Sequence, residues 1–538
     1  MRSCIPVFTF CCYKPVLGSS SSFVCRLNAL VSLPRITSPA SFSSLVPASS
    51  APFTFPTTRY SIHEQQASTS AKKNTLINLL RGWPSPHLLP SELLRQAANR
   101  ALSDPNIFVP GLQYGPDPGY QPLREELARW LARSYSSSGS ASDPEEICIT
   151  GGASQSLAAI LASFTDPGVT RAVWAAAPCY YLACPIFEDA GLGAGAGRLR
   201  AVKEDGEGVD VTLLEKMLGE FDRDYDSQNT RAKEEVKDPG PARKHYRHVI
   251  YLVTTCSNPS GKTLSLERRR RLVQIARKFD ALVISDDVYD FLQWSTVPSS
   301  TQEQRLVLPR LSDIDIALGE SRWDPLRKRF GHAVSNGSFS KLIGPGVRTG
   351  WVHASRDFVY GLSQTGQTRS GGAASQLTAA VIHQFMISGW LDEHIVKTVR
   401  PALQRRHRLI VDTVKKEMGA DMGVKVVAET SEQGKEVFGG YFVWLELPEG
   451  VDAREVAKRA KEEESLVVAE GQLFEVAGDE EKARFPRNLR LSFSWEEEGA
   501  LREGVERLGR VVRSILEGGA RESVGRAQGE GDFALTGI

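Results

Sequence analysis

The residues best suited to chemistry surround Lys341, at the end of the stretch Ser-Asn-Gly-Ser-Phe-Ser-Lys in residues 335–341. A lysine amine can form a Schiff base with a carbonyl compound. A turn rich in glycine and proline then leads to Arg348, whose guanidinium could bind a phosphate. Most lysines are solvated surface charges, so this interpretation depends on what else the chain provides.

Three further motifs follow short apolar runs, and each also has a commonplace explanation. Residues 151–155, Gly-Gly-Ala-Ser-Gln, could bind a phosphate at the start of a helix, although such turns also serve packing alone. Residues 257–261, Ser-Asn-Pro-Ser-Gly, could be an ordinary Asn-Pro turn. Residues 285–289, Ser-Asp-Asp-Val-Tyr, place an aspartate at the end of an apolar run. If it is buried it needs a cation or a donor, unless it caps the next segment.

The elements that must position these motifs alternate between short β-rich runs and helical patterns. Buried strands are predicted at residues 147–150, 172–175, 248–253 and 281–284. A helix with Ser265 as its N-cap is predicted over residues 265–279, and another over 90–102 with Ser91 as a cap. This alternation predicts an α/β fold with a parallel sheet covered by helices on both faces, and ligands collect at the carboxyl ends of such strands.

Composition excludes several classes of function. The 538 residues carry a net charge of +1, which gives no support for nucleic-acid binding. No apolar run is long enough to span a bilayer, so no membrane partner is expected. The 8 cysteines show no metal-ligand spacing, which predicts no metal site, a reducing compartment and buried structural thiols.

The N-terminal region differs from the rest, because no acidic residue precedes Glu64 while serines, prolines and scattered arginines are frequent. This composition is typical of an organellar transit peptide and predicts a mitochondrial protein. The alternative is a disordered extension without an address on a cytoplasmic protein.

Taken together and in this order, the four motifs resemble the fold-type I pyridoxal-phosphate enzymes. They are most similar to the class I/II aminotransferases of the 2-aminoadipate aminotransferase branch. The resemblance covers about residues 76–516 and is supported by residues 113–124, 178–180, 439–445 and 488–494. It implies an α/β fold with a large, mostly parallel sheet domain and a smaller α+β domain.

The expected domain order follows from this resemblance and from composition. A disordered or transit-peptide-like extension (1–75) precedes a segment that packs with the small domain (76–112). The large cofactor-binding domain (113–395), with charged surface insertions at about 205–247 and 295–332, is followed by the small domain (396–517) and a disordered tail (518–538).

The resemblance also implies roles for single residues. Lys341 would hold pyridoxal 5'-phosphate (PLP) as an internal aldimine and move the substrate's Cα proton. Asp286 would pair with the pyridine nitrogen, and it is preferred over Asp287 because Tyr289 completes the family's Asp-x-x-Tyr pattern. Asn258 and Tyr289 would hydrogen-bond the phenolic oxygen of the cofactor.

Further roles concern the ring face, the phosphate and the substrate. Tyr180, in preference to Tyr181, would stack on the cofactor ring. The substrate α-carboxylate would bind Arg490, with Asn258 and Gly82 also at the substrate site. Tyr114 would reach the phosphate in the partner subunit, so a homodimer is expected. The residues expected to hold the phosphate are Ser154, Gln155, Ser338 and Arg348.

The sequence departs from the family pattern in three places. The usual Asn-Pro-Thr-Gly has Ser260 in place of threonine, which keeps the hydroxyl. The distance from Asp286 to Lys341 is longer than usual. Residues 470–474, Glu-Gly-Gln-Leu-Phe, replace the usual Pro-Gly-x-x-Phe, so no substrate is inferred from them.

The expected function is a transaminase that moves an amino group from an L-amino acid to a 2-oxo acid, with 2-oxoglutarate the expected acceptor, in a ping-pong cycle. A PLP-dependent β-lyase or decarboxylase remains an alternative, since Lys341 and Asp286 serve those reactions as well. A cofactor-binding transcription regulator is not expected, because the residues before 76 lack the helical period of a winged-helix domain. The sequence leaves the amino donor open.

Overall fold

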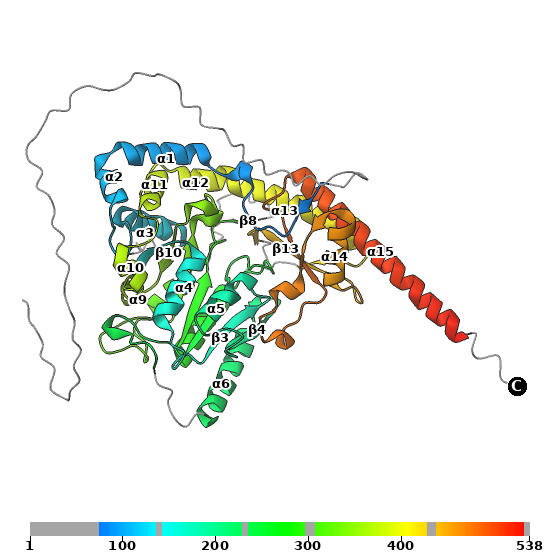
Figure 1. Ribbon diagram of the computed structural model, residues 1–538, viewed down its shortest axis with the longest axis horizontal. Helices are drawn as coiled ribbons and strands as arrows, with labels where there is room; N and C mark the ends of the chain where they lie inside the picture. Colours follow the sequence, from blue (N-terminus) through cyan, green and yellow to red (C-terminus); the bar gives the residue numbers. More distant parts are fainter. Residues whose placement is uncertain (1–74, 136–142, 229–234, 296–306, 428–436, 532–538) are drawn as a thin grey trace, which may run out of the picture. The chain divides into compact units, whose positions relative to one another are not determined.

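The core of the chain is a large twisted sheet built from the short apolar runs of the sequence (Figure 1). The computed structural model describes residues 75–135, 143–228, 235–295, 307–427 and 437–531. Among these residues, eight strands pair in the order β2 (Ile147–Thr150), β10 (Gly350–His353), β9 (Ala333–Ser338), β7 (Ala281–Asp286), β6 (His248–Leu252), β3 (Ala172–Ala177), β4 (Leu199–Asp205) and β5 (Gly208–Val209).

The direction of the strands confirms the predicted parallel sheet. β9, β7, β6, β3 and β4 pair in parallel, whereas β10 runs antiparallel to both β2 and β9. All four predicted strands are present. β3 and β7 extend two residues beyond their predicted ends, and β6 ends one residue earlier. Because β7 includes Asp286, this carboxylate lies at the carboxyl end of a central strand.

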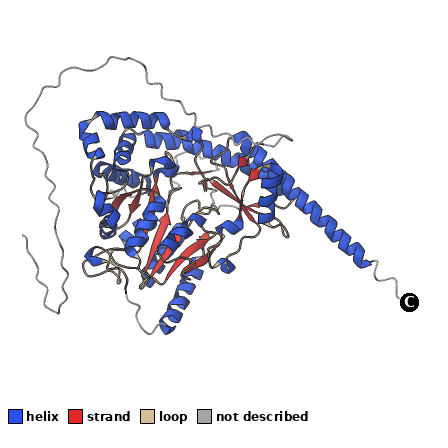
Figure 2. Cartoon of the chain, viewed as in Figure 1, coloured by secondary structure: helices blue, strands red, loops and turns tan. Residues whose placement is uncertain are grey.

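Helices cover both faces of this sheet, as the alternation along the sequence predicts (Figure 2). Along β3, Val173 points to one apolar core and Trp174 to the other. The first core includes α4 (Ala153–Phe164), α5 (Cys184–Asp189) and α9 (Arg356–Ser363); the second includes α6 (Val211–Gln228), α7 (Leu266–Phe279) and α8 (Leu311–Ala317). A strand buried on both faces must be apolar at every position, which explains the continuous runs.

The two predicted helix caps have different outcomes. Ser265 caps α7 as predicted, since its hydroxyl accepts a 3.3 Å hydrogen bond from the Arg268 amide. The predicted cap at Ser91 is wrong: α1 (Ser91–Ser103) begins at Ser91 itself, and the residue before it, Pro90, makes no side-chain cap. The Ser91 amide instead donates to the Leu89 carbonyl. This turn gives the Ser91 amide a hydrogen-bond acceptor without a serine cap.

Both segments predicted as charged surface insertions carry helices that contribute to the core. In the first, α6 buries Leu214 and Leu218 against the sheet. In the second, α8 buries Leu311 and packs on α7. Residues 229–234 and 296–306 of these segments lie outside the described part of the chain.

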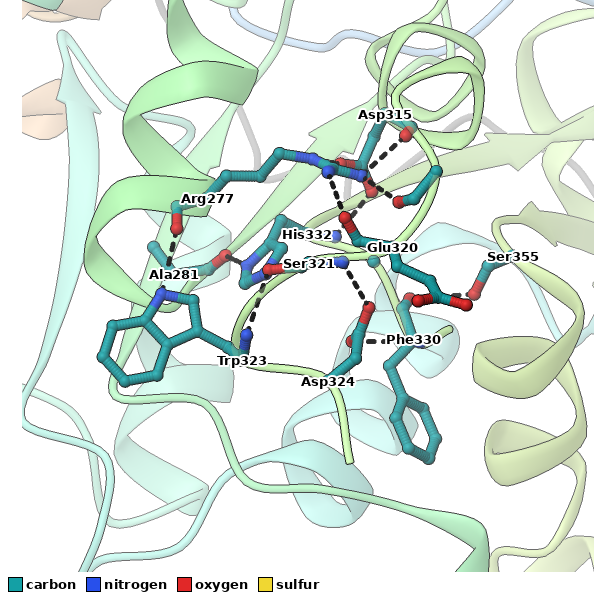
Figure 3. A network of polar contacts seen from close by, with 12 residues as sticks. Arg277, Ala281, Asp315, Glu320, Ser321, Trp323, Asp324, Phe330, His332 and Ser355 are labelled. Atoms are coloured by element: carbon teal, nitrogen blue, oxygen red, sulfur yellow. Dashed lines mark hydrogen bonds and ion pairs between the residues drawn. The ribbon is translucent and has the colours of Figure 1, made fainter. Parts of the chain in front are cut away.

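A polar network fastens the second of these segments to the sheet (Figure 3). The Arg277 guanidinium of α7 donates to the Asp315 carboxylate at 2.6 Å, and the His332 amide donates to the other oxygen of Asp315 at 2.6 Å. Burial lowers the pKa of His332 to about 3, so its ring is neutral. The ring lies 2.9 Å from the Ala281 carbonyl and 2.7 Å from the Ser321 hydroxyl. Charges that suggested a solvated loop are therefore paired within the protein.

The smaller domain is an antiparallel sheet with helices, in the order β11 (Lys425–Val426), β13 (Phe442–Glu446), β16 (Asn488–Ser492) and β15 (Ala469–Glu470). Its helices are α13 (Arg400–Val414), α14 (Ala453–Glu464) and α15 (Glu498–Gly531). The sequence predicted a disordered tail from residue 518, but α15 continues to Gly531 (Figure 1). Residues 532–538 lie outside the described residues.

The segment that precedes the large domain contacts both domains. Its strand β1 (Ile77–Asn78) pairs with β14 (Leu466–Val467), and the Leu79 carbonyl accepts from the Ser492 amide, both on the side of the small domain. Its helices α1 and α2 (Pro105–Leu112) pack instead on α11 (Gln376–Ile387).

Two predictions fall on residues that the structure leaves undescribed. The transit-peptide-like extension lies in residues 1–74, outside the described part of the chain. The cysteines of that extension are likewise not described; of the others, Cys148, Cys179 and Cys256 are buried and Cys184 is half-buried. No helix among the described residues is long and apolar enough to cross a membrane.

Candidate active site

A cavity of about 420 Å³ opens at the carboxyl ends of the central strands. It is lined by the turns after β3, β6, β7 and β9, by the start of α4, by the small-domain strands β13 and β16, and by residues 78–83. The predicted site residues that line it are Gly82, Ser154, Tyr180, Asn258, Asp286, Tyr289, Ser338, Lys341, Arg348 and Arg490. The structure therefore brings together all of the predicted residues except Gln155 and Tyr114.

Asp286 lines this cavity and has an unpaired carboxylate oxygen. The Tyr251 hydroxyl donates to its Oδ2 at 3.0 Å, while its Oδ1 is buried with no hydrogen-bond partner among the described residues. Burial raises the pKa of Asp286 to about 6, and Tyr251 and Lys341 oppose that shift. A buried carboxylate oxygen without a donor is costly, so this geometry fits a ligand that brings a protonated ring nitrogen.

Asp287, the alternative considered for this role, is turned away from the cavity. Its carboxylate accepts hydrogen bonds from the hydroxyls of Thr254, Ser285 and Ser335. These three donors satisfy it inside the sheet. Asp286 is thus the member of the pair that can meet a ligand.

Lys341 ends a short 3₁₀ turn, Phe339–Lys341, that directly follows β9. Its Nζ donates to the Gly82 carbonyl at 2.9 Å and lies 5.1 Å from the centroid of the Tyr441 ring. Burial and the nearby Arg490 lower the pKa of Lys341 to about 8, although Asp286 acts in the opposite direction. An amine with such a pKa is neutral in an appreciable fraction near neutral pH, which a nucleophile requires.

Groups that could hold an anion meet where α4 begins. Gly152, at φ +99°, precedes the helix, and a Cβ there would lie 2.9 Å from the Arg348 guanidinium. Arg348 Nη2 donates to the Gly151 carbonyl at 2.8 Å, which holds the cation across the first turn. Ser154 lies in that turn, and Ser338 also lines the cavity. Free backbone N–H groups, a guanidinium and hydroxyls are the donors that a phosphate prefers.

Two predicted residues lie elsewhere. The Gln155 side chain is absent from the cavity lining; its Oε1 accepts a 2.9 Å hydrogen bond from the Gly151 amide and so shapes the turn. Tyr114 is 87% exposed and does not line the cavity of its own chain. Its role toward a partner subunit stays a prediction.

Arg490 is a buried cation that forms no ion pair with any residue that the structure describes. Its Nη1 donates to the Asn258 side-chain carbonyl at 2.9 Å and its Nη2 to the Leu80 carbonyl at 2.6 Å. Its Nε has no partner among the described residues, and its guanidinium lies 4.0 Å from the centroid of the Phe442 ring. Burial lowers the pKa of Arg490 to about 10. A buried guanidinium held only by neutral groups is suited to a carboxylate ligand.

The tyrosines form the remaining walls. Burial, with Asp286 nearby, raises the pKa of Tyr180 to about 12, and burial raises the pKa of Tyr289 well above its usual range. Both phenols are therefore neutral hydrogen-bond donors near neutral pH. Tyr181 also lines the cavity, but its ring packs edge-on against Phe474, 5.6 Å between centroids.

Sequence reasoning missed Tyr251, Phe442 and Arg81. Tyr251 lies inside the apolar strand β6 and reads as core. Phe442 packs so closely that a Cβ on Gly82 would lie 2.5 Å from its ring, a contact that only the fold creates. Arg81 directly precedes Gly82 and lines the cavity, and that adjacency was the one available signal.

Comparison with known proteins gives the family. The model of the "Aminotransferase class I and II" family matches residues 76–508. An uncharacterized protein of Saccharomyces cerevisiae is 33% identical over 454 residues, which cover 81% of this chain and 97% of the yeast protein. The 2-aminoadipate transaminase of Thermus thermophilus is 28% identical over 444 residues, which cover 82% of this chain and 91% of that enzyme.

A solved structure extends the agreement to three dimensions. The α-aminoadipate aminotransferase of Thermus thermophilus, in complex with N-(5'-phosphopyridoxyl)-L-leucine, is 26% identical with a TM-score of 0.61, covering 82% of this chain and 93% of that one. The family match spans most of the chain, including every residue of the cavity. The protein is therefore a member of the class I and class II aminotransferases, enzymes that depend on pyridoxal phosphate.

Proposed function

We propose that this aminotransferase moves the amino group of an L-amino acid to 2-oxoglutarate in two successive half-reactions, with Lys341 as the residue that binds PLP covalently. The observation that carries the proposal is the meeting in one cavity of a lysine of lowered pKa, an unpaired oxygen of Asp286, and Arg490, which forms no ion pair with a described residue. A cofactor aldehyde could react with Lys341, a protonated ring nitrogen could pair with Asp286, and a substrate carboxylate could pair with Arg490.

The residues fit PLP at each of its polar groups. Asp286 would accept from the ring nitrogen, and Tyr289 would donate to the phenolic oxygen. The start of α4 and Arg348 would hold the phosphate. When bound, PLP withdraws electrons from the Cα of the amino acid and makes its proton acidic.

Lys341 has the position and the pKa to move that proton. With PLP in the cavity, the Lys341 amine, when it is not joined to the cofactor, would take the Cα proton and return it to the cofactor side. With a pKa of about 8, both the protonated and the neutral form of Lys341 are populated near neutral pH. Its hydrogen bond to the Gly82 carbonyl, at 2.9 Å, gives the displaced amine a resting partner.

Arg490 would orient the substrate by its α-carboxylate. A bidentate guanidinium–carboxylate pair fixes two atoms next to Cα and so sets which Cα bond faces the cofactor. Because this pair retains the carboxylate, it favours transamination over decarboxylation. Arg490 does not distinguish transamination from β-elimination, since elimination also retains the carboxylate.

We also propose a homodimer in mitochondria. Exposed apolar side chains gather on α2 and just after it, with Val109 50%, Leu112 59% and Tyr114 87% exposed, and such patches mark interfaces.

The acid-free composition before Glu64 supports the proposed mitochondrial location. Fusing residues 1–75 to a fluorescent protein tests it, and a diffuse cytoplasmic signal would contradict it.

Transamination is tested by absorbance of the PLP-loaded protein with a panel of L-amino acids. We expect some of them to convert the cofactor to pyridoxamine phosphate and 2-oxoglutarate to reverse the change. Lys341→Ala should lose turnover by roughly 10²- to 10⁴-fold while still binding PLP noncovalently. Release of pyruvate and ammonia without an acceptor would show a lyase instead. Native turnover in Lys341→Ala would overturn the lysine assignment.

A further inference from the structure

Arg81 sits on a strip of chain that is fixed on both sides by the cations of the site. The carbonyl before it, on Leu80, accepts from Arg490 Nη2 at 2.6 Å. The carbonyl after it, on Gly82, accepts from Lys341 Nζ at 2.9 Å. With both neighbouring peptide groups held, the Arg81 side chain has a defined origin on the wall of the cavity, which it lines.

Two tryptophans hold the Arg81 guanidinium in place. It lies 4.6 Å from the ring centroid of Trp83 and 4.9 Å from that of Trp495, and these rings meet edge to face at 5.6 Å. The Ser494 hydroxyl donates to the Trp83 carbonyl at 2.8 Å and ties the two segments together. Aromatic faces attract a guanidinium but leave its N–H donors and its charge unsatisfied.

No described carboxylate forms an ion pair with Arg81, although two acidic residues follow Trp495 directly. Glu496 accepts a 2.8 Å hydrogen bond from the Asn78 amide. Glu497 accepts from the Ser85 hydroxyl at 3.1 Å and lies near Arg406. The nearby acids are therefore engaged elsewhere, and Arg81 is available to a ligand.

Among the described residues, three guanidinium groups line the cavity without an ion pair: Arg348, which the proposed function assigns to the phosphate, Arg490 and Arg81. We propose that Arg81 is a specificity-determining residue that binds the distal carboxylate of dicarboxylic amino acids and 2-oxo acids. This inference rests on the proposed function, in which Arg490 takes the α-carboxylate. A second carboxylate on the substrate gains charge-assisted hydrogen bonds from Arg81, and an uncharged side chain of equal length gains none.

Binding of unreactive acids tests the proposal without turnover. The PLP-loaded full-length protein is titrated calorimetrically with glutarate and with valerate, which have the same number of carbons but two and one carboxylates. We expect glutarate to bind roughly 10- to 100-fold more tightly. Arg81→Gln should abolish that preference by weakening glutarate alone, and Arg81→Lys should retain part of it. The control Arg95→Gln, which changes an exposed arginine of α1 paired with Glu92, should behave like the native protein.

The half-reaction with L-glutamate and L-norvaline gives the second readout. Arg81→Gln should raise KM for glutamate at least about tenfold and leave the values for norvaline within about threefold. An unchanged ratio between the two substrates, or an equal loss for both, would overturn the role of Arg81. If the native protein converts neither these two nor any amino acid of the panel, the proposed function itself fails. If it transaminates but never prefers the dicarboxylate, only the inference about Arg81 fails.

Discussion

Asp286, the last residue of β7, and Asp287 are adjacent in sequence but differ in environment. Asp286 has a buried oxygen without a partner, whereas Asp287 is satisfied by three hydroxyls. We therefore expect Asp286→Asn to lower kcat by roughly 10²- to 10³-fold with little change in Tm, because the lost charge acts on the cofactor. Asp287→Asn should mainly lower Tm. Steady-state kinetics and thermal melts of both variants check this, and the reverse pattern would exchange their roles.

The lowered pKa of Lys341 predicts how cofactor uptake depends on pH. Below about pH 8 its amine is mainly protonated and cannot attack the PLP aldehyde; above it the amine is mainly neutral. Covalent uptake by the apoprotein should therefore rise roughly tenfold per pH unit below about 8 and level off above it. Borohydride reduction followed by mass spectrometry of the Lys341 peptide measures this. An inflection near pH 10, as for a solvated lysine, would contradict the shift.

At the residue scale the sequence identified ten of the residues that line the cavity but not how each candidate side chain points. Asp286 ends a strand of the mostly parallel sheet, and Asn258 and Lys341 follow such strands, whose carboxyl ends meet by construction. Gln155 also follows such a strand, yet its side chain turns back to the Gly151 amide. The direction of the Gln155 side chain depends on the backbone conformation of this turn, which the pattern of residue types does not predict.

At the scale of elements, Gly82 keeps the strip of residues 80–82 close to β13. A Cβ at Gly82 would lie 2.5 Å from the ring of Phe442, the ring on which Arg490 stacks. Gly82→Ala should displace that ring, raise KM for amino acids severalfold and cost about 1–3 kcal/mol of stability. Gly366→Ala is the matched control, because nothing lies within 4 Å of its added methyl. Equal behaviour of the two variants in kinetics and denaturant melts would refute the packing argument.

Elements with a regular apolar pattern were predicted well, and elements held by charges were not. The strands and the Ser265 cap follow from runs of apolar residues and from a capping serine. Residues 295–332 suggested a solvated surface segment because they are rich in charge, but Asp315 in this segment pairs with Arg277 inside the protein. Sequence composition counts charges and cannot show which of them face each other.

At the scale of the whole molecule, the exposed apolar residues of α2 predict self-association. We expect the full-length protein to sediment as a dimer and Leu112→Asp to shift it toward the monomer with a lower affinity for PLP. Lys416→Asp, a change on a distant exposed side chain, should leave the dimer intact. Analytical ultracentrifugation with and without PLP measures both, and a monomeric native protein would remove the role proposed for Tyr114.

The pairing of β1 with β14 joins segments that are far apart in sequence, and this limits how early during synthesis the active site can assemble. Leu80 and Arg490 are 410 positions apart, yet the bond between them holds one wall of the cavity. During synthesis the first part of the site emerges from the ribosome long before its last part, and contacts so distant in sequence form late. The nascent chain therefore carries the large domain before it has Arg490, the arginine proposed to bind the substrate. The cavity is completed only after Arg490 has been synthesised.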